Sequence, residues 1–321
     1  MYDVAGLGSA LMDFTFEVDD ALLGELGFVK GNMHLIDEEK SRMLLDRLSG
    51  FPMIQTPGGS AANTAAGISL LGGSAVFMGK VGGDAIGDSY GRESERTGLS
   101  VRLARAARMT GHAITLITPD SERTFATHLG AATAFGAEDV SAEDIRNSRI
   151  LHIEGYMLEG DLKAASIHAM KIAKECGARI SIDLADPALV ARNLADLKEI
   201  MREYADIIYA NEDEAAAFTG KKGEDSAEEL SRYCTIAVVK FGEKGSLIRS
   251  EGRNFSIPSY KVKAVNTNGA GDMYAAGVLY GISHGMPIER AGRIGSYAAS
   301  LVVAQVGARL PGKLSVDQMG I

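Results

Sequence analysis

The chain has 321 residues, 46% of them hydrophobic, and a formal net charge of -9. This acidity argues against nucleic acid or an anionic membrane as the main partner, and no apolar run approaches the roughly 20 residues that span a bilayer. Cys176 and Cys234 lie far apart and outside any CxxC pattern, which argues against a disulfide framework or a zinc cluster. We therefore expect a cytoplasmic protein whose partners are small molecules.

Short apolar runs rich in β-branched residues alternate along the chain with longer segments of helical period. This alternation is typical of parallel strands joined by crossover helices, so the predicted fold class is α/β. Strands are predicted at 75–78, 150–153, 179–183, 207–210 and 236–240. Helices with one apolar face are predicted at 61–71, 162–175, 194–204 and 212–219.

Two segments interrupt the alternation. Residues 14–48 mix a short strand, loops and a helix, and residues 109–129 alternate like a hairpin with its turn at 118–121. We expect them to form a small sheet beside the main one. Because no repeat, low-complexity tract or linker divides the chain, residues 1–321 are predicted to be a single domain.

The first glycine cluster opens the predicted helix at 61–71. Gly58 and Gly59 would allow a polar ligand to touch the backbone. Asn63, about one turn into the helix, would offer an amide that can both donate to and accept from a sugar hydroxyl. Tight packing of a helix on a strand would explain these glycines equally well.

A second cluster runs from Asn266 to Asp272 and leads into a small, apolar helical segment. The free N–H groups and positive dipole end of a helix start make a site for an anion, and glycines allow a phosphate to approach the main chain. We interpret Asp272 as the base for a hydroxyl that attacks that phosphate. The structural alternative is an acid that complements the helix dipole.

In this order and separation, the two clusters resemble the two motifs of the ribokinase-like superfamily, the PfkB carbohydrate and nucleoside kinases. The first motif matches from Gly58 to Gly82 and the second from Asn266 to Leu279. The resemblance covers nearly the whole chain and is greatest to adenosine kinases and their bacterial relatives. It implies a three-layer α/β/α sandwich with a mostly parallel central sheet and a small β lid formed by segments 14–48 and 109–129.

The resemblance also implies a reaction, the transfer of the ATP γ-phosphoryl to a primary hydroxyl of a nucleoside. Asp272 matches the catalytic base of the family. The backbone at Gly269, Ala270 and Gly271 matches the anion hole that stabilises charge on the transferred phosphoryl. The residues that match the substrate-binding positions, where the vicinal hydroxyls of a sugar are held, are Asp13, Gly59, Ser60 and Asn63.

Other matching positions concern ATP and its metal. Asn211 and Glu214 match a motif that organises Mg²⁺, with Glu214 acting through water because magnesium keeps much of its hydration shell. Lys240 stands where the family often has threonine near the ATP phosphates, and it would contact a phosphate or point to solvent. The remaining ATP-binding positions are Gly242, Gly245 and Asn268. Arg123 would reach from the lid toward substrate or phosphate, or remain a solvated charge.

Asn266 departs from the family, because most relatives have aspartate there as part of a monovalent-cation site. The loss of a formal charge weakens such a site, so potassium activation is left open. Lids of this superfamily either leave the protein monomeric or pair two subunits, which leaves a monomer or a homodimer. Lid closure over bound substrate would exclude water from the phosphoryl.

The acceptor is the least determined part of the prediction. Aromatic residues make up only 6% of the chain, so a purine would be held by an apolar slot rather than by aromatic stacking. The residues predicted to form that slot are Leu11, Ile36, Tyr156 and Met157. A sugar kinase that acts on ribose, fructose or 2-keto-3-deoxygluconate is the alternative. A nucleotide or sugar sensor without turnover is the non-enzymatic alternative, and the acid at 272 argues against it.

Overall fold

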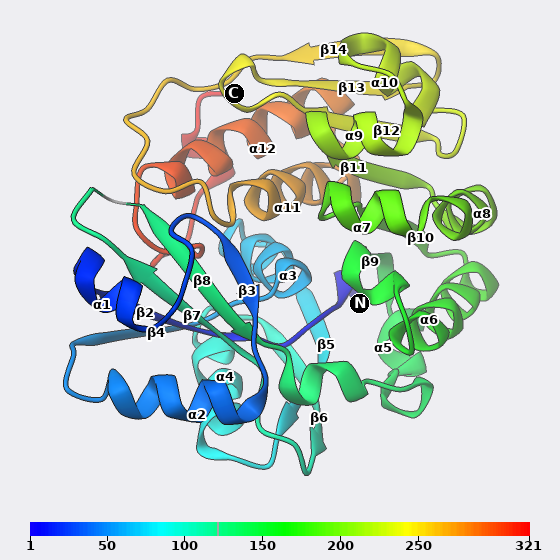
Figure 1. Ribbon diagram of the computed structural model, residues 1–321. Helices are drawn as coiled ribbons and strands as arrows, with labels where there is room; N and C mark the ends of the chain where they lie inside the picture. Colours follow the sequence, from blue (N-terminus) through cyan, green and yellow to red (C-terminus); the bar gives the residue numbers. More distant parts are fainter. Residues whose placement is uncertain (121) are drawn as a thin grey trace.

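Two β-sheets organise the computed structural model, which describes residues 1–120 and 122–321 (Figure 1). The strand order of the large sheet is β14-β13-β12-β11-β10-β9-β1-β5-β6. Its strands are β1 (Tyr2–Leu7), β5 (Ala75–Gly82), β6 (Ser100–Ala106), β9 (Ser148–Glu154), β10 (Arg179–Asp183), β11 (Ile207–Asn211), β12 (Ile236–Lys240), β13 (Ser246–Ser250) and β14 (Arg253–Ile257). Neighbours from β6 to β12 are parallel, whereas β12, β13 and β14 pair antiparallel. The predicted mostly parallel α/β sheet is confirmed.

Helices cover both faces of the large sheet, which gives three layers (Figure 1). Side chains of successive strand residues point to opposite faces. Tyr209 of β11 accordingly lies in one buried apolar cluster, and Ile208 lies in the other. The first cluster contains residues of α3 (Ser60–Leu70), α4 (Ala85–Arg96), α11 (Ala270–Ser283) and α12 (Ile288–Val303). The second contains residues of α5 (Ala142–Arg146), α6 (Leu162–Cys176), α7 (Pro187–Arg192), α8 (Leu194–Tyr204), α9 (Glu212–Thr219) and α10 (Gly223–Leu230).

Every strand and helix predicted for the main sheet is present, but the predicted strands omit β1, β6, β13 and β14. β6 and β14 are the two edge strands of the large sheet. Each has a neighbouring strand on one side only, and edge strands commonly carry charged side chains. Arg102 and Arg105 of β6 are exposed, as are most residues of β14. These strands therefore lack the buried apolar run on which the predictions relied.

The small sheet has the strand order β3-β8-β7-β2-β4. Its strands are β2 (Met12–Glu17), β3 (Met33–Leu35), β4 (Met53–Pro57), β7 (His112–Ile117) and β8 (Arg123–His128), and it is accompanied by α1 (Asp20–Glu25) and α2 (Glu38–Arg47). The predicted second sheet is confirmed, and it gains β4, which lies outside the predicted segments. The predicted turn at 118–121 includes Ser121, which lies outside the described residues.

The carboxyl ends of the parallel strands define one edge of the large sheet, where ligands of open α/β folds commonly bind. Polar residues stand at the ends of four neighbouring strands, namely Glu154, Asp183, Asn211 and Lys240. The helices α3 and α11 begin at this same edge, as their hydrogen bonds to one another show below. Among the described residues, no helix combines the length and apolarity needed to cross a membrane.

Candidate active site

The acid at the start of α11 is held by the first turn of α3. Ser60 Oγ donates to Asp272 Oδ1 at 2.7 Å, and Asn63 Nδ2 donates to Asp272 Oδ2 at 2.9 Å. Thr64 Oγ1 donates to the backbone carbonyl of Asp272 at 3.2 Å. Burial raises the pKa of Asp272, and the hydrogen bonds from Ser60 and Asn63 oppose that rise. The structure thus brings the two glycine clusters together around one carboxylate.

The N-termini of α3 and α11 differ in which groups accept hydrogen bonds from their free N–H groups. At α3, the buried Glu154 carboxylate accepts hydrogen bonds from the Ala61 and Ser9 N–H groups, each at 2.9 Å. At α11, the N-cap residue Gly269 has φ 79° and supplies no side-chain hydrogen bond. A Cβ at Gly269 would stand 2.7 Å from the Ala308 Cβ, so only glycine fits this turn. Unlike α3, α11 thus starts without a side-chain cap at its positive end, where an anion is favoured.

Lys240 places an ammonium group beside this helix start. Its Nζ donates to Asp183 Oδ2 at 2.9 Å and lies 3.1 Å from the position that a Cβ of Gly271 would take. Burial alone would lower the pKa of Lys240, but the carboxylates of Asp183 and Glu214 outweigh it and raise the pKa. The lysine remains charged and its side chain is only 17% exposed, so the predicted alternative in which it points to solvent is wrong.

Asn211 and Glu214 form a capping box at the start of α9. The Glu214 carboxylate accepts from Asn211 N at 2.7 Å and from Asn211 Nδ2 at 2.6 Å, and Glu214 N donates to Asn211 Oδ1 at 2.8 Å. Burial, then the charge of Asp183, raises the pKa of Glu214 to about 7. The two residues of the predicted magnesium motif are thus hydrogen-bonded to each other. The positive charge of Lys240 also acts on the Glu214 carboxylate and opposes the rise of its pKa.

The remaining ATP-binding candidates lie in two loops. Gly242 and Gly245 bound a short turn between β12 and β13, and both have positive φ. Asn268 N donates to Asn266 Oδ1 at 2.9 Å, while Asn266 Nδ2 donates to the Val306 carbonyl at 2.6 Å. The amide at 266 therefore uses both of its ends to hold the loop that leads into α11.

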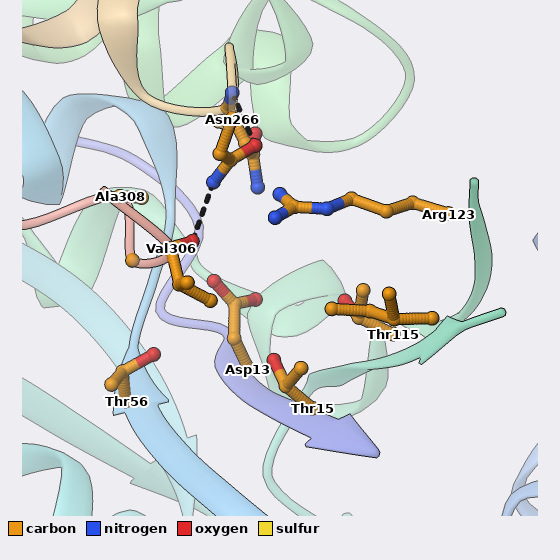
Figure 2. A pocket seen from close by; sticks show the side chains of 11 residues that line it. Asp13, Thr15, Thr56, Thr115, Arg123, Asn266, Val306 and Ala308 are labelled. Carbon is orange, nitrogen blue, oxygen red and sulfur yellow. Dashed lines mark hydrogen bonds between the residues drawn. The ribbon is translucent and has the colours of Figure 1, made fainter. Parts of the chain in front are cut away.

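A small polar cavity lies between the small sheet and the α11 loop (Figure 2). Asp13 of β2 is at its centre, and the Arg123 guanidinium points from β8 toward Asn266. Burial raises the pKa of Asp13 to about 7, a rise that Arg309 opposes and Asp272 increases. Burial lowers the pKa of Arg123, and among the described residues no ion pair joins it. The side-chain hydroxyls that line the cavity belong to Thr15, Thr56 and Thr115.

Comparison with known protein families identifies the family of this chain. Residues 33–313 match the family described as pfkB family carbohydrate kinase. The chain belongs to the pfkB family. As a pfkB kinase it is a phosphotransferase with an alcohol group as acceptor and ATP as co-substrate, which rules against the sensor without turnover.

Solved structures of two similar proteins cover nearly the whole pfkB kinase. An adenosine kinase from Sinorhizobium meliloti is 32% identical, with TM-score 0.89 over 99% of this chain and 98% of its own. A probable sugar kinase from Rhizobium etli CFN 42 is 31% identical, with TM-score 0.89 over 99% and 97%. Among curated proteins, adenosine kinase 1 of Arabidopsis thaliana is 24% identical over 96% of each chain. The predicted ribokinase-like fold is confirmed.

Of the four residues predicted for the apolar slot, three keep an exposed part in this pfkB kinase. Met157 is fully buried in the core cluster shared with α6, so its predicted place in the slot is wrong. Tyr156, its neighbour after β9, is 40% exposed. Leu11 is half-buried next to Gly111 at the start of the small sheet. Ile36 is half-buried against the core of that sheet.

Three residues at the site were missed from the sequence. Glu154 and Asp183 each end a predicted buried strand, and an acid at the carboxyl end of such a strand is a recognisable signal. Arg309 gives no such signal, because it follows α12 in an irregular segment. Only the folded chain places its guanidinium 2.9 Å from the Asn63 side-chain oxygen.

Proposed function

We propose that this kinase transfers the γ-phosphoryl of ATP to a primary hydroxyl of a nucleoside, with Asp272 as the base. The observation that carries the proposal is the place of the Asp272 carboxylate. It is half-buried, held by Ser60 and Asn63, and stands in the first turn of a helix whose N-cap offers no side chain. A base there would face a hydroxyl bound by α3 and a phosphate bound by α11.

The anion hole would consist of the backbone at Gly269, Ala270 and Gly271. Their N–H groups would stabilise charge on the phosphoryl as it moves in line between donor and acceptor. The ammonium of Lys240, beside Gly271, would add a fixed positive charge to the same phosphoryl. Asp183 would hold that lysine in place through its 2.9 Å ion pair.

Asp13, Gly59 and Asn63 would bind the sugar hydroxyls of the acceptor. An ionised Asp13 accepts two hydrogen bonds from neighbouring hydroxyls, and it can do so only above its pKa of about 7. Arg123, without an ion-pair partner among the described residues, would approach the phosphates when the small sheet closes. Orientation of the hydroxyl is the main contribution of these groups.

Asn211, Glu214, Gly242, Gly245 and Asn268 would line the ATP side of the site. Within the described residues, no three His, Cys, Asp or Glu side chains gather as a metal cluster. Both oxygens of Glu214 already accept hydrogen bonds. A magnesium ion carried by the ATP phosphates would therefore keep water ligands, and Glu214 would reach it through one of them.

Two observations bear on the acceptor. The probable sugar kinase from Rhizobium etli CFN 42 matches both sheets as well as the adenosine kinase from Sinorhizobium meliloti does, so support for a nucleoside rests on the match to adenosine kinase 1 over 96% of this chain. The threonine-rich lining of the cavity around Asp13 suits a hydroxyl-rich sugar instead. A sugar kinase is therefore the second candidate.

An acceptor screen tests the proposal. The enzyme, ATP and magnesium would be incubated with adenosine, guanosine, inosine, cytidine, ribose, fructose and 2-keto-3-deoxygluconate, and the phosphorylated products identified by mass spectrometry. We expect nucleoside 5′-monophosphate, with kcat/KM for a nucleoside at least about tenfold above that for any sugar. Preference for a sugar by that margin would replace the first candidate by the second.

A further inference from the structure

The segment 305–309, which follows α12, lies against the loop that leads into α11. The Val306 carbonyl accepts a hydrogen bond from Asn266 Nδ2 at 2.6 Å. The Cβ of Ala308 closes the space next to Gly269, leaving no room for a side chain there. The phosphate-binding side of the proposed site is thus built partly on this C-terminal segment.

The same segment reaches the acceptor side through Arg309. Gln305 Nε2 donates to the backbone carbonyl of Arg309 at 2.7 Å and holds the turn closed. Arg309 Nε donates to Asn63 Oδ1 at 2.9 Å, and its two terminal nitrogens lie 3.3 Å from Ser94 Oγ and 3.4 Å from the Gly58 carbonyl. One guanidinium therefore joins the glycine bend, α3 and α4.

This contact determines which way the Asn63 amide points. A guanidinium has only donors, so its partner on Asn63 must be the carbonyl oxygen. The amide nitrogen is then left to donate to Asp272, as it does at 2.9 Å. A flipped amide would turn its oxygen toward the Asp272 carboxylate and repel it.

We propose that Arg309 is a positioning residue of this kinase, which fixes the Asn63 amide and thereby aligns Asp272 and Asp13 with the acceptor hydroxyls. The inference rests on the proposed function for its kinetic consequences. Its structural part can be measured without any acceptor, because it concerns the orientation of the Asn63 amide and the effect of the Arg309 charge on the pKa of Asp13. The charged and titratable groups that face Asp13 are Arg309, Asp272, Tyr90 and Arg123.

The test compares Arg309→Met and Arg309→Lys with Arg293→Met, which removes an exposed arginine paired within α12. In the protein without ligands, NMR would follow the Asn63 side-chain amide and the titration of the Asp13 carboxyl carbon. We expect Arg309→Met to shift the amide signals and to move the Asp13 titration to higher pH, because a nearby positive charge is lost. Arg309→Lys should restore the titration in part, since it keeps the charge but lacks the fork of donors.

With the acceptor identified by the screen, Arg309→Met should raise acceptor KM and lower kcat, each about tenfold, with ATP KM within about twofold. The acid limb of kcat/KM should move to higher pH. Adding Ser94→Ala, which removes a second partner of the guanidinium, should cost less in the Arg309→Met background than in wild type. Unchanged NMR signals in Arg309→Met would overturn the inference whatever the acceptor is. A wild-type enzyme that phosphorylates none of the acceptors would instead overturn the proposed function.

Discussion

Asp13, which we propose binds the acceptor, is also a residue whose ionisation opposes folding. Its half-buried carboxyl loses solvation near Asp272, and Arg309 compensates only in part, so its pKa rises to about 7. A raised pKa means that the folded state prefers the protonated acid, and ionisation opposes folding. That cost is absent below the pKa of the unfolded chain, near 4, and is complete above about pH 7.

Asp13→Asn should therefore stabilise the protein while impairing acceptor binding. At pH 8 its free energy of unfolding should exceed that of wild type by about 1 to 4 kcal/mol, and the difference should shrink toward pH 5. Chemical denaturation at both pH values measures this. Asp46→Asn, at an exposed position of α2, is the control and should show no such dependence. An equal difference at both pH values would mean that the carboxyl is not strained by burial.

At the scale of elements, the candidate site lies at the N-termini of α3 and α11, which differ in how their free N–H groups are bonded. Glu154 fills the start of α3 with a protein carboxylate, and α11 begins with glycine and no cap. The first glycine cluster packs tightly, as the structural alternative expects, and Asn63 contacts Asp272, while a bond from Asn63 to a sugar hydroxyl stays a prediction. A Cβ at Gly58 would stand 2.5 Å from Asp13 Oδ2.

Gly269→Ala tests the bare start of α11. A left-handed φ costs a non-glycine residue about 1 to 2 kcal/mol, and here the added Cβ would also meet Ala308. We expect kcat to fall at least about tenfold through displacement of the anion hole. Gly285→Ala is the matched control, because Gly285 has φ 68° but open space around it. It should lose only the stability that a left-handed φ costs and keep kcat, and equal kcat losses in both variants would contradict the assignment.

At the scale of the whole molecule, the sequence was sufficient for the sandwich, because buried apolar runs such as 236–240 are visible in one dimension. It was sufficient to single out Asp272 and Asn63, which the structure brings together, because each lies in a local glycine pattern; their roles in the reaction stay predictions. It could not give the Lys240–Asp183 pair or the reach of Arg309, because these contacts join residues 57 and 246 positions apart in the chain. Met157 was misplaced because side-chain direction after β9 depends on packing against α6.

The two-sheet arrangement leads to a prediction about water. Asp13 and Arg123 belong to the small sheet, whereas Asp272 belongs to α11, which packs on the large sheet, so a complete site needs both parts. If acceptor binding draws the sheets together, ATP hydrolysis without acceptor should be at least about 100-fold slower than phosphoryl transfer. A coupled ADP-release assay with and without acceptor measures the ratio. Equal rates would contradict closure as the step that excludes water.

The most direct test of the account is the turnover of Asp272→Asn. Loss of the base should lower kcat by about three orders of magnitude or more and leave KM for ATP and acceptor within about threefold. Asp88→Asn, which removes an acid from the first turn of α4, is the control for the alternative that Asp272 only complements a helix dipole, and it should keep full kcat. A large kcat loss is expected in Asp272→Asn alone. Turnover within tenfold of wild type in that variant would contradict it.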